Sequence, residues 1–341
     1  MPNIITSPTE IDWTLWDIDR VEPTIENPWR GKSFDWISKT IADIIEFWYF
    51  RSTFWWESNI SFHPTQNTFC SVIAKKWKQI PIELDNISSA HHRLEVVEWK
   101  ETKLNILEHI SSISSALGVN FNIDIKWANS WPTLEDSIHL FASKINESLV
   151  KQEKDFKYFT VEKPTKIDFC DKRWAYIMLF PDNWDNKLIL DLSIKYPWKS
   201  IWEQRIVFEV NDEDYLQYVS KARTNAFWTN EKLLKILNSK FLPTNYIRNI
   251  FLDFWYDNVL AFNENKIINP KDNFTREDWI YAEVLYHNIL DILWVLWIDS
   301  KLDWETWFRF TWKVVTFANS HEHDLKVMNM MKNWDIPIKK L

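Results

Sequence analysis

Two short segments place a histidine beside a carboxylate in a pattern that suits a metal ion. His287 and Asp291 lie four residues apart in the apolar segment 284–293, which the spacing predicts as a helix. Residues four apart share one helix face, so the imidazole and the carboxylate can meet at one cation. An unpaired carboxylate among apolar residues is costly, so we expect Asp291 to have a strong partner. The pair alone is not specific, because most such pairs in proteins bind no metal.

A second histidine supplies a candidate third ligand. Glu108 and His109 open another segment with helical spacing, and His109 holds the place in the first half of the chain that His287 holds in the second. A catalytic zinc site typically has three protein ligands and an open position for water. Glu108 would then be a carboxylate beside the metal, which suits general-base hydrolysis. The alternative is that Glu108 and His109 only interact with the dipole at a helix start.

The remaining polar candidates are less specific. His321 and His323 precede the last predicted helix, where a solvated loop is the simplest interpretation. Thr224 either offers a hydroxyl group or starts a turn. The sequence contains no Gly-rich phosphate-binding loop, and no Ser-His-Asp or Cys-His arrangement with meaningful spacing.

Alternating and helical periodicities predict the elements that must position these residues. Strands are expected within 40–97 and 156–210, at Asn120–Lys126 and at Phe308–Phe317. Helices are expected at about 104–117, 135–149, 212–221, 276–296 and 321–332.

The order of these elements repeats, which predicts an α+β protein of two domains with similar topology. Each domain would be a mostly antiparallel sheet packed against helices, with the active site at the domain interface. We expect an N-terminal extension at 1–35, a first domain at 36–150 that contains Glu108 and His109, and a second domain at 151–341 that contains His287, Asp291 and His321.

Composition and charge exclude several classes of protein. The net charge of -8 argues against a nucleic-acid-binding surface. The N-terminus shows no signal peptide, and no segment reaches the roughly 18 apolar residues that span a bilayer. Cys70 and Cys170 are far apart and form no Cys-x-x-Cys pair, so we expect reduced thiols. We therefore expect a cytoplasmic protein, and a monomer.

The composition contains one anomaly, which is 24 Trp and 2 Gly in 341 residues. An average chain of this length holds about 24 Gly. Trp recurs where the backbone favours glycine, as in Glu98-Trp99-Lys100 and Asn183-Trp184-Asp185 between strand-like segments. We therefore infer that most Trp positions represent UGA codons that the source organism reads as glycine.

Several spaced motifs resemble one enzyme family. They are Asn105-Ile-Leu-Glu108-His109-Ile, Ser220-Lys-Ala-Arg-Thr224, Tyr256-Asp-Asn-Val-Leu260, Glu283-Val-Leu-Tyr-His287-Asn-Ile-Leu-Asp291 and Ser320-His321. Together they resemble UDP-3-O-acyl-N-acetylglucosamine deacetylase, the zinc amidase of lipid A biosynthesis, over about residues 37–331. In this comparison Trp255 stands where the family has Gly, and Trp297 stands where the internal repeat has Gly118. Trp174 matches a Lys-Trp-Ala segment of the family, so we expect it to be a genuine tryptophan.

The resemblance implies a zinc ion (Zn²⁺) bound by His109, His287 and Asp291, with Glu108 as general base toward the attacking water. It implies that the oxyanion is stabilised by zinc, the Thr224 hydroxyl and protonated His321. His321 or Glu108 would protonate the departing amine. The implied substrate is a small-molecule acylated UDP-amino sugar, whose acyl chain is the only expected contact with a membrane.

Three positions depart from the family pattern. The family has Lys, Asp and Lys where this chain has Asn288, Val295 and Ala318. The absent lysines would contact the phosphates or the sugar of the substrate. The absent Asp would support His321, and Asp324 or Glu322 is a candidate for this role. Two alternatives stay open for this reason: a zinc amidase that acts on another N-acetylated sugar, and a non-catalytic sugar-nucleotide binding module.

Overall fold

A computed structural model of the chain describes residues 3–5, 39–51, 57–65, 71–74, 78–90, 93–99, 101–105, 107–126, 138–151, 157–181, 188–195, 201, 203–227, 259–263, 265–267, 277–293, 306–308 and 313–340. Statements about structure below refer to these residues.

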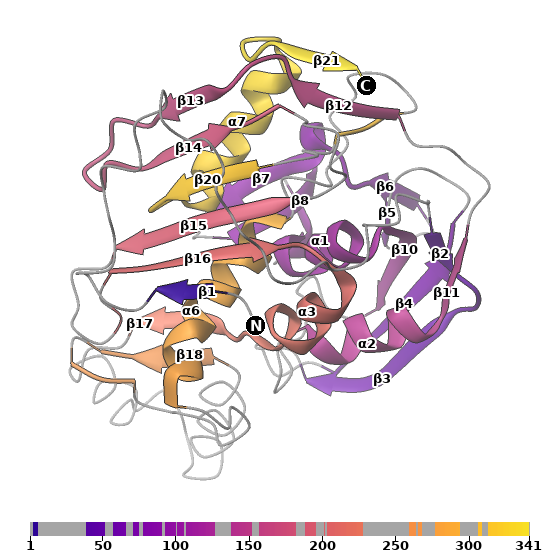
Figure 1. Cartoon of the computed structure of the whole chain (residues 1–341). Coiled ribbons are helices and arrows are strands. Elements are labelled where there is room, and N and C mark those ends of the chain that lie inside the picture. The colour runs from indigo at the N-terminus through magenta and orange to yellow at the C-terminus, as the bar shows by residue number, and fades with distance from the viewer. Residues whose placement is uncertain are drawn as a thin grey trace.

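The first half of the chain forms a seven-stranded sheet and a three-stranded sheet (Figure 1). The larger sheet has the order β11-β2-β10-β4-β3, and β5 pairs with both β10 and β6. Its strands are β2 (Lys39–Ile41), β3 (Ile45–Arg51), β4 (Glu57–Pro64), β5 (Ser71–Ala74), β6 (Lys78–Pro81), β10 (Val119–Lys126) and β11 (Leu149–Lys151). The smaller sheet consists of β7 (Ile87–Ala90), β8 (Arg93–Glu98) and β9 (Glu101–Asn105), and a short 3-10 helix, η4 (Leu84–Asn86), precedes it.

The second half forms a six-stranded sheet of order β1-β16-β15-β20-β14-β13, in which β1 is the one described strand that comes from outside that half. Its strands are β1 (Asn3–Ile5), β13 (Thr165–Asp168), β14 (Tyr176–Leu179), β15 (Ile189–Lys195), β16 (Glu203–Glu209) and β20 (Lys313–Phe317). Two small sheets complete this half: β12 (Lys157–Val161) with β19 (Thr306–Phe308) and β21 (Ile338–Lys340), and β17 (Thr224–Phe227) with β18 (Val259–Phe262). Most pairings are antiparallel, so the predicted α+β class is confirmed.

Five α-helices and a second 3-10 helix lie in the described part of the chain. They are α1 (Leu107–Leu117), α2 (His139–Glu147), α3 (Asp212–Gln217), η5 (Val219–Lys221), α6 (Glu277–Leu293) and α7 (His321–Lys332). Helix α1 packs on α6 and on β8, and α6 packs on β15 (Figure 1). Helices α1 and α6 therefore pack together between β8 of the first half of the chain and β15 of the second half.

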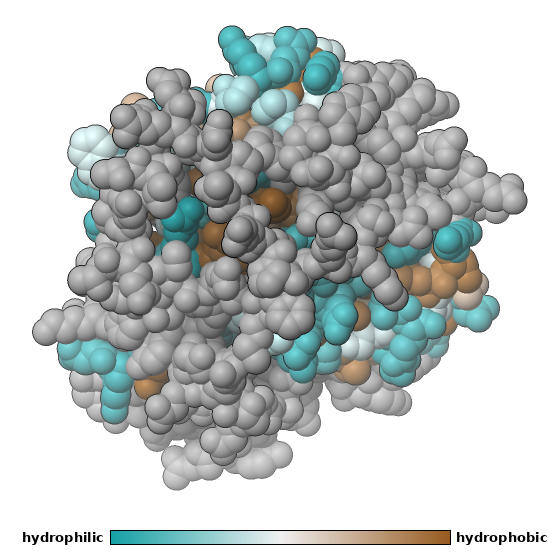
Figure 2. Space-filling model, viewed as in Figure 1, coloured by the Kyte–Doolittle hydropathy of each residue, from teal (hydrophilic) through white to brown (hydrophobic). Residues whose placement is uncertain are grey.

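Helices α2 and α3 carry charged residues on the sides that face solvent. Lys144 and Glu147 of α2 and Glu213 of α3 are exposed, and Figure 2 shows a mostly hydrophilic surface over these two helices. No described helix has the length and apolar character needed to cross a membrane.

Several predicted boundaries shift in the structure. The segment Asn3–Ile5, which lies within the expected N-terminal extension, is a strand that pairs with β16 of the six-stranded sheet. Leu104 belongs to β9 rather than to the following helix, because Leu104 pairs with Val96. The predicted helix 212–221 divides into α3 and η5. The predicted strand Phe308–Phe317 contains all of β20 and only the last residue of β19.

Three tryptophans have the left-handed backbone conformation that favours glycine. Among the described residues, five residues other than glycine have positive φ, and three of them are Trp99 (52°), Trp174 (60°) and Trp334 (63°). Trp99 lies at the tip of the β8–β9 hairpin. Gly118, which follows α1, has a φ of 63°, the conformation in which Gly often ends helices. Trp255, Trp297 and Trp184 lie outside the described residues.

The end of α7 also places a tryptophan at a position that favours glycine. After the C-cap Asn333, the N–H of Trp334 donates to the carbonyl of Met331 (3.0 Å) and the N–H of Asp335 donates to the carbonyl of Met330 (2.8 Å). This is the Schellman motif, whose left-handed position is usually Gly. Trp334 therefore occupies a position where a Cβ atom is unfavourable.

Replacement of Trp99 by Gly is expected to stabilise the protein. A left-handed residue with a Cβ atom costs roughly 1 kcal/mol, and Trp99 is 87% exposed, so little packing is lost. We expect Trp99→Gly to raise the melting temperature by about 2 °C in a calorimetric scan. The control is Trp279→Gly inside α6, where Gly weakens a helix. A lower melting temperature for Trp99→Gly would contradict the prediction.

Candidate functional site

Helix α1 places Glu108 and His109 in its first turn, inside the protein. Leu107, Ile110 and Leu117 supply apolar side chains at helical spacing, and every residue of α1 is buried. The small serines between them let neighbouring elements approach closely. Ser112 Oγ donates to the carbonyl oxygen of His109 (2.7 Å), which fixes this turn of the helix.

Helix α6 supplies His287 and Asp291 on one face, as their spacing predicts. Apolar residues surround them on the helix, and Val284, Leu285 and Ile289 are fully buried. A helix that is apolar on most sides belongs in a core. Because α6 packs against α1, the histidines of both helices come together there.

His109, His287 and Asp291 present their ligand atoms to one point. One nitrogen from each histidine and one carboxylate oxygen of Asp291 all lie within 4.8 Å of one another. The two imidazole rings meet edge to face with centroids 5.3 Å apart, and His287 Nε2 is 3.4 Å from Asp291 Oδ1. The structure therefore brings the three predicted ligands together from two helices far apart in sequence.

His321 and Thr224 lie against this group. His321, the first residue of α7, places Nε2 3.7 Å from Asp291 Oδ1 and 3.8 Å from Glu108 Oε1. Thr224, the first residue of β17, places Oγ1 3.4 Å from His109 Nε2. His321 thus lies at the site and not in a separate solvated loop. All six residues that the resemblance singled out therefore lie in one cluster.

Glu108 is held by a backbone group from another sheet. The N–H of Leu94 in β8 donates to Glu108 Oε2 (3.0 Å), while Oε1 faces His321. Glu108 is 3% exposed. A carboxylate that accepts a buried N–H keeps a fixed orientation, which a proton-accepting group requires.

The electrostatics of the site favour neutral histidines. Burial, with a smaller effect from His321, lowers the pKa of His109 to about 3. Burial lowers the pKa of His287 well below its ordinary value, and His109 and His321 lower it further. A neutral imidazole keeps the nitrogen lone pair that binds a metal.

The pKa of Asp291 shifts in the opposite direction, because burial disfavours the charged form of a carboxyl group. Burial raises its pKa well above the ordinary value, and Glu108 and Asp324 add to this effect. A divalent cation at the ligand atoms would reverse the shift, because it stabilises the carboxylate.

The donor set fits a zinc ion. Two imidazoles and one carboxylate are ligands of known catalytic zinc sites. Asp291 Oδ1, which faces His287 Nε2, is buried and has no hydrogen-bond partner among the described residues. Buried polar atoms are normally satisfied, so such an atom beside a neutral histidine pair is consistent with a cation ligand.

Two of the three departures from the family pattern lie in described segments. Asn288 Nδ2 donates to the carbonyl of Val284 in its own helix (2.7 Å), so its amide bonds to the helix backbone. Ala318 has a φ of 50° directly after β20. Val295 lies outside the described residues.

Of the two candidates for the missing carboxyl group, Asp324 is buried and Glu322 is exposed. Asp324 is 1% exposed, and its Oδ1 accepts a hydrogen bond from Asn319 (2.9 Å). It lies one turn after His321 on α7 and acts electrostatically on Asp291.

One pair of residues near the site was given no role in the sequence analysis, although both residues lie in motifs that resemble the deacetylase family. Arg223 and Glu283 form a buried ion pair (2.8 Å) between the residue before Thr224 and the helix that carries His287. The signal that could have revealed them is a charged side chain inside an apolar segment, such as Glu283 directly before Val284 and Leu285. Such residues are almost never fully buried unless they are paired.

Comparison with known proteins identifies the family. Residues 56–330 match the family model described as UDP-3-O-acyl N-acetylglycosamine deacetylase. The chain belongs to this deacetylase family. It is 23% identical over 239 residues to the UDP-3-O-acyl-N-acetylglucosamine deacetylase of Campylobacter jejuni subsp. jejuni serotype O:23/36 (strain 81-176), which covers 68% of this chain and 70% of that protein.

Other members of the deacetylase family have similar sequence identities to this chain. The protein of the same name from Campylobacter hominis is 23% identical over 235 residues, or 68% of this chain and 71% of that protein. The one from Campylobacter fetus subsp. fetus is 24% identical over 191 residues, or 56% and 59%. The matched range contains all six residues of the cluster, from Glu108 to His321.

Replacement of Asp324 by Asn is expected to change how the stability of the metal-free protein depends on pH. Burial raises the pKa of Asp324 from 3.8 to about 8, so the folded state binds this proton more tightly than the unfolded state. The resulting stabilisation is full below about pH 4 and is lost as pH rises to about 8. We expect the free energy of unfolding to fall less between pH 5 and pH 8 in Asp324→Asn than in the wild type.

Urea unfolding in the presence of a chelator measures this difference. The exposed Asp335→Asn is the control, and it should follow the wild-type profile. Parallel profiles for Asp324→Asn and the wild type would show that Asp324 titrates normally.

Proposed function

We propose that this chain is a zinc-dependent deacetylase that hydrolyses the N-acetyl group of a UDP-3-O-acyl-N-acetylglucosamine, a step of lipid A biosynthesis. The observation that carries the proposal is the convergence of the ligand atoms of His109, His287 and Asp291 within 4.8 Å. Membership of the deacetylase family and the names of the relatives support the same substrate.

The zinc ion would be held by His109, His287 and Asp291. When bound, it would supply Lewis-acid polarisation of the acetamide carbonyl and a lower pKa for a water molecule. Glu108 Oε1 accepts the proton of the attacking water, because Oε2 is already held by the N–H of Leu94. The protein thereby fixes the base before the substrate binds.

Two further groups act on the tetrahedral intermediate. The Thr224 hydroxyl and protonated His321 donate hydrogen bonds to its oxyanion, which is the oxygen of the former carbonyl. Glu108 or His321 then protonates the departing amine, and the 3.8 Å between Glu108 Oε1 and His321 Nε2 keeps both within reach of the same atoms. The products are acetate and a UDP-linked glucosamine that retains its O-acyl chain.

Asn288 and Ala318 favour a second candidate function. Asn288 bonds to its own helix backbone and is not a cation that could contact a phosphate. A zinc amidase with another N-acetylated sugar substrate would keep the metal cluster and change only the recognition of the nucleotide. A non-catalytic sugar-nucleotide binding module is the third candidate, and it predicts no turnover of either substrate.

We further propose the cellular setting and the organisation of the protein. The enzyme acts in the cytoplasm as a monomer, and only the acyl chain of its substrate contacts a membrane. The chain divides into domains at 36–150 and 151–341. Strands β2 through β11 and strands β12 through β21 belong to separate sheets, which supports this division.

We also propose that most Trp positions are glycine in the native protein. The positive φ of Trp99, Trp174 and Trp334 supports this, and it groups Trp174 with the others although the family comparison matched it to a tryptophan. The intact mass of protein purified from the native source tests the proposal, because each exchange removes a countable mass. A mass that corresponds to 24 Trp would refute it.

The acetate-release assay tests the proposed reaction directly. We expect the wild type to release acetate from a UDP-3-O-acyl-N-acetylglucosamine, and Glu108→Ala to retain zinc but lose about 10²-fold or more of kcat, since it removes the base and no ligand. Turnover only of simpler N-acetyl sugars would favour the second candidate, and no turnover together with no bound zinc would favour the third.

Two variants make the loss in Glu108→Ala interpretable. Glu147→Ala, on the exposed side of α2, should behave like the wild type. Asp291→Ala should lose zinc affinity itself, because it removes a ligand. Loss of zinc from Glu108→Ala would mean that Glu108 binds the metal.

A further inference from the structure

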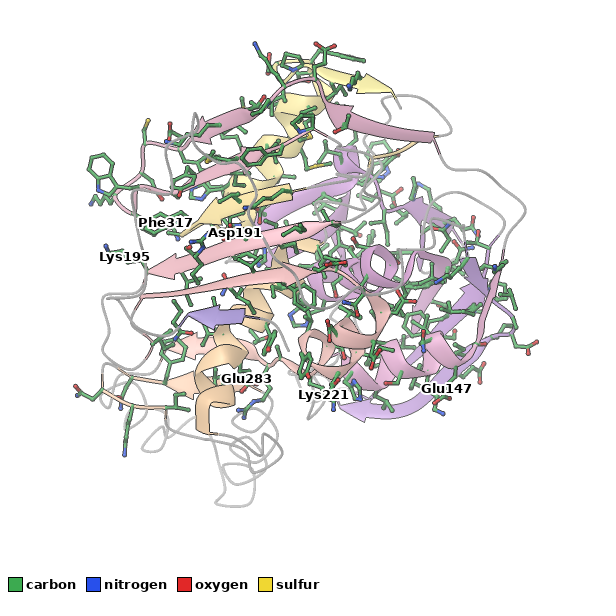
Figure 3. The ribbon with its side chains drawn as sticks, in the orientation of Figure 1. Glu147, Asp191, Lys195, Lys221, Glu283 and Phe317 are labelled. Atoms are coloured by element: carbon green, nitrogen blue, oxygen red, sulfur yellow. The ribbon has the colours of Figure 1, made fainter. Side chains whose placement is uncertain are left out.

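A buried ion pair connects two elements that carry site residues. Arg223 Nε donates to Glu283 Oε1 (2.8 Å), and Arg223 Nη2 donates to Glu283 Oε2 (2.9 Å). The side chains are 1% and 0% exposed. Arg223 directly precedes Thr224, and Glu283 lies one turn before His287 on α6. Figure 3 labels Glu283 on this helix.

The pair also fixes the backbone beside Thr224. The N–H of Arg223 donates to Glu283 Oε1 (2.9 Å), so one carboxylate binds both the guanidinium group and the main chain. This third bond sets the start of β17 against α6. Thr224 then reaches His109 on α1, with Oγ1 3.4 Å from Nε2.

Stability alone is a poor explanation for this pair. The cost of removing two charges from water often equals or exceeds their attraction, and apolar replacements of buried pairs are often neutral or stabilising. A bidentate Arg–carboxylate pair does add geometric specificity. The pair therefore suits a role in orientation more than a role in holding the fold together.

We propose that the Arg223–Glu283 pair positions both the Thr224 hydroxyl and the metal-ligating face of α6. Glu283, His287 and Asp291 lie at successive turns of the helix, so the bond to Glu283 sets the rotation of this face. This inference rests on the proposed function, in which His287 and Asp291 bind zinc and Thr224 contacts the oxyanion. Arg223 and Glu283 are positioning residues, because they act through these three.

A second, partly buried Arg–carboxylate pair serves as a control. Arg205 donates to both oxygens of Asp191 (2.7 and 2.8 Å), and Lys313 Nζ lies 3.0 Å from Asp191 Oδ2. These residues lie on β15, β16 and β20, which carry none of the site residues. Arg205→Met removes a partly buried guanidinium group but leaves Asp191 paired with Lys313.

The test uses the double variant Arg223→Met/Glu283→Gln in the full chain. The Gln oxygen can still accept the backbone N–H of residue 223, and no unpaired charge remains. We expect unfolding within about 5 °C of the wild type, but zinc affinity about 10-fold weaker by competition with a chromophoric chelator. We expect kcat to fall about 10-fold with KM nearly unchanged, since oxyanion contacts act in the transition state.

Glu283→Asp provides a second variant. It keeps both charges, but its side chain is one methylene group shorter, so the carboxylate lies farther from Arg223. It should weaken zinc binding in the same direction, and it decides the question alone if the double variant does not fold. Zinc affinity and kcat equal to the wild type in the folded variants would overturn the proposal. An equal loss in Arg205→Met would also overturn it, because the effect would then be general.

The zinc measurement separates this proposal from the proposed function. A wild type that binds zinc but releases no acetate would refute the deacetylase reaction, and weaker zinc binding in the variants would still support the positioning role. An active wild type whose variants keep both zinc affinity and kcat would refute only the positioning role.

Discussion

The structure depends on the burial of ionisable side chains where α1 crosses α6. His109 and His287 are held neutral by burial, and the pKa of Asp291 is raised by burial and by nearby carboxyl groups. Such a cluster is unfavourable in an apolar interior unless its groups are paired or bind a cation. One bound divalent ion would offset the repulsion and use the lone pairs that burial leaves available. The same desolvation that opposes charge on these side chains thus favours a metal ion there.

The surrounding fold holds this cluster through contacts from several sheets. The N–H of Leu94 in the small sheet of the first half orients Glu108, and β17 of the second half supplies Thr224. Helix α7 adds His321 from the C-terminal part of the chain. No single sheet contains the site, which explains why its residues are spread from position 108 to position 321. The Arg223–Glu283 ion pair is one of the interactions that hold β17 and α6 in position relative to each other.

Sequence spacing was sufficient for the local parts of this arrangement. The separation of His287 and Asp291 by four residues predicted a shared helix face, and the regular apolar spacing of α1 and α7 predicted both helices closely. The approach of His109 to His287 is a tertiary contact, so only the repeat and the family resemblance suggested it. The predicted ends of helices and strands were wrong where pairing between strands decides which element a residue joins. Leu104 joins β9 because it pairs with Val96 of β8. The Arg223–Glu283 pair joins residues 60 positions apart, and no local pattern encodes such a contact.

An anomalous difference map at the zinc absorption edge, from crystals of the purified protein, tests the central claim most directly. The account predicts one strong peak within bonding distance of a nitrogen of His109, a nitrogen of His287 and a carboxylate oxygen of Asp291, with Glu108 beside it but not bound. Crystals with no peak at these three residues after zinc addition, or with a peak only elsewhere, would contradict the account.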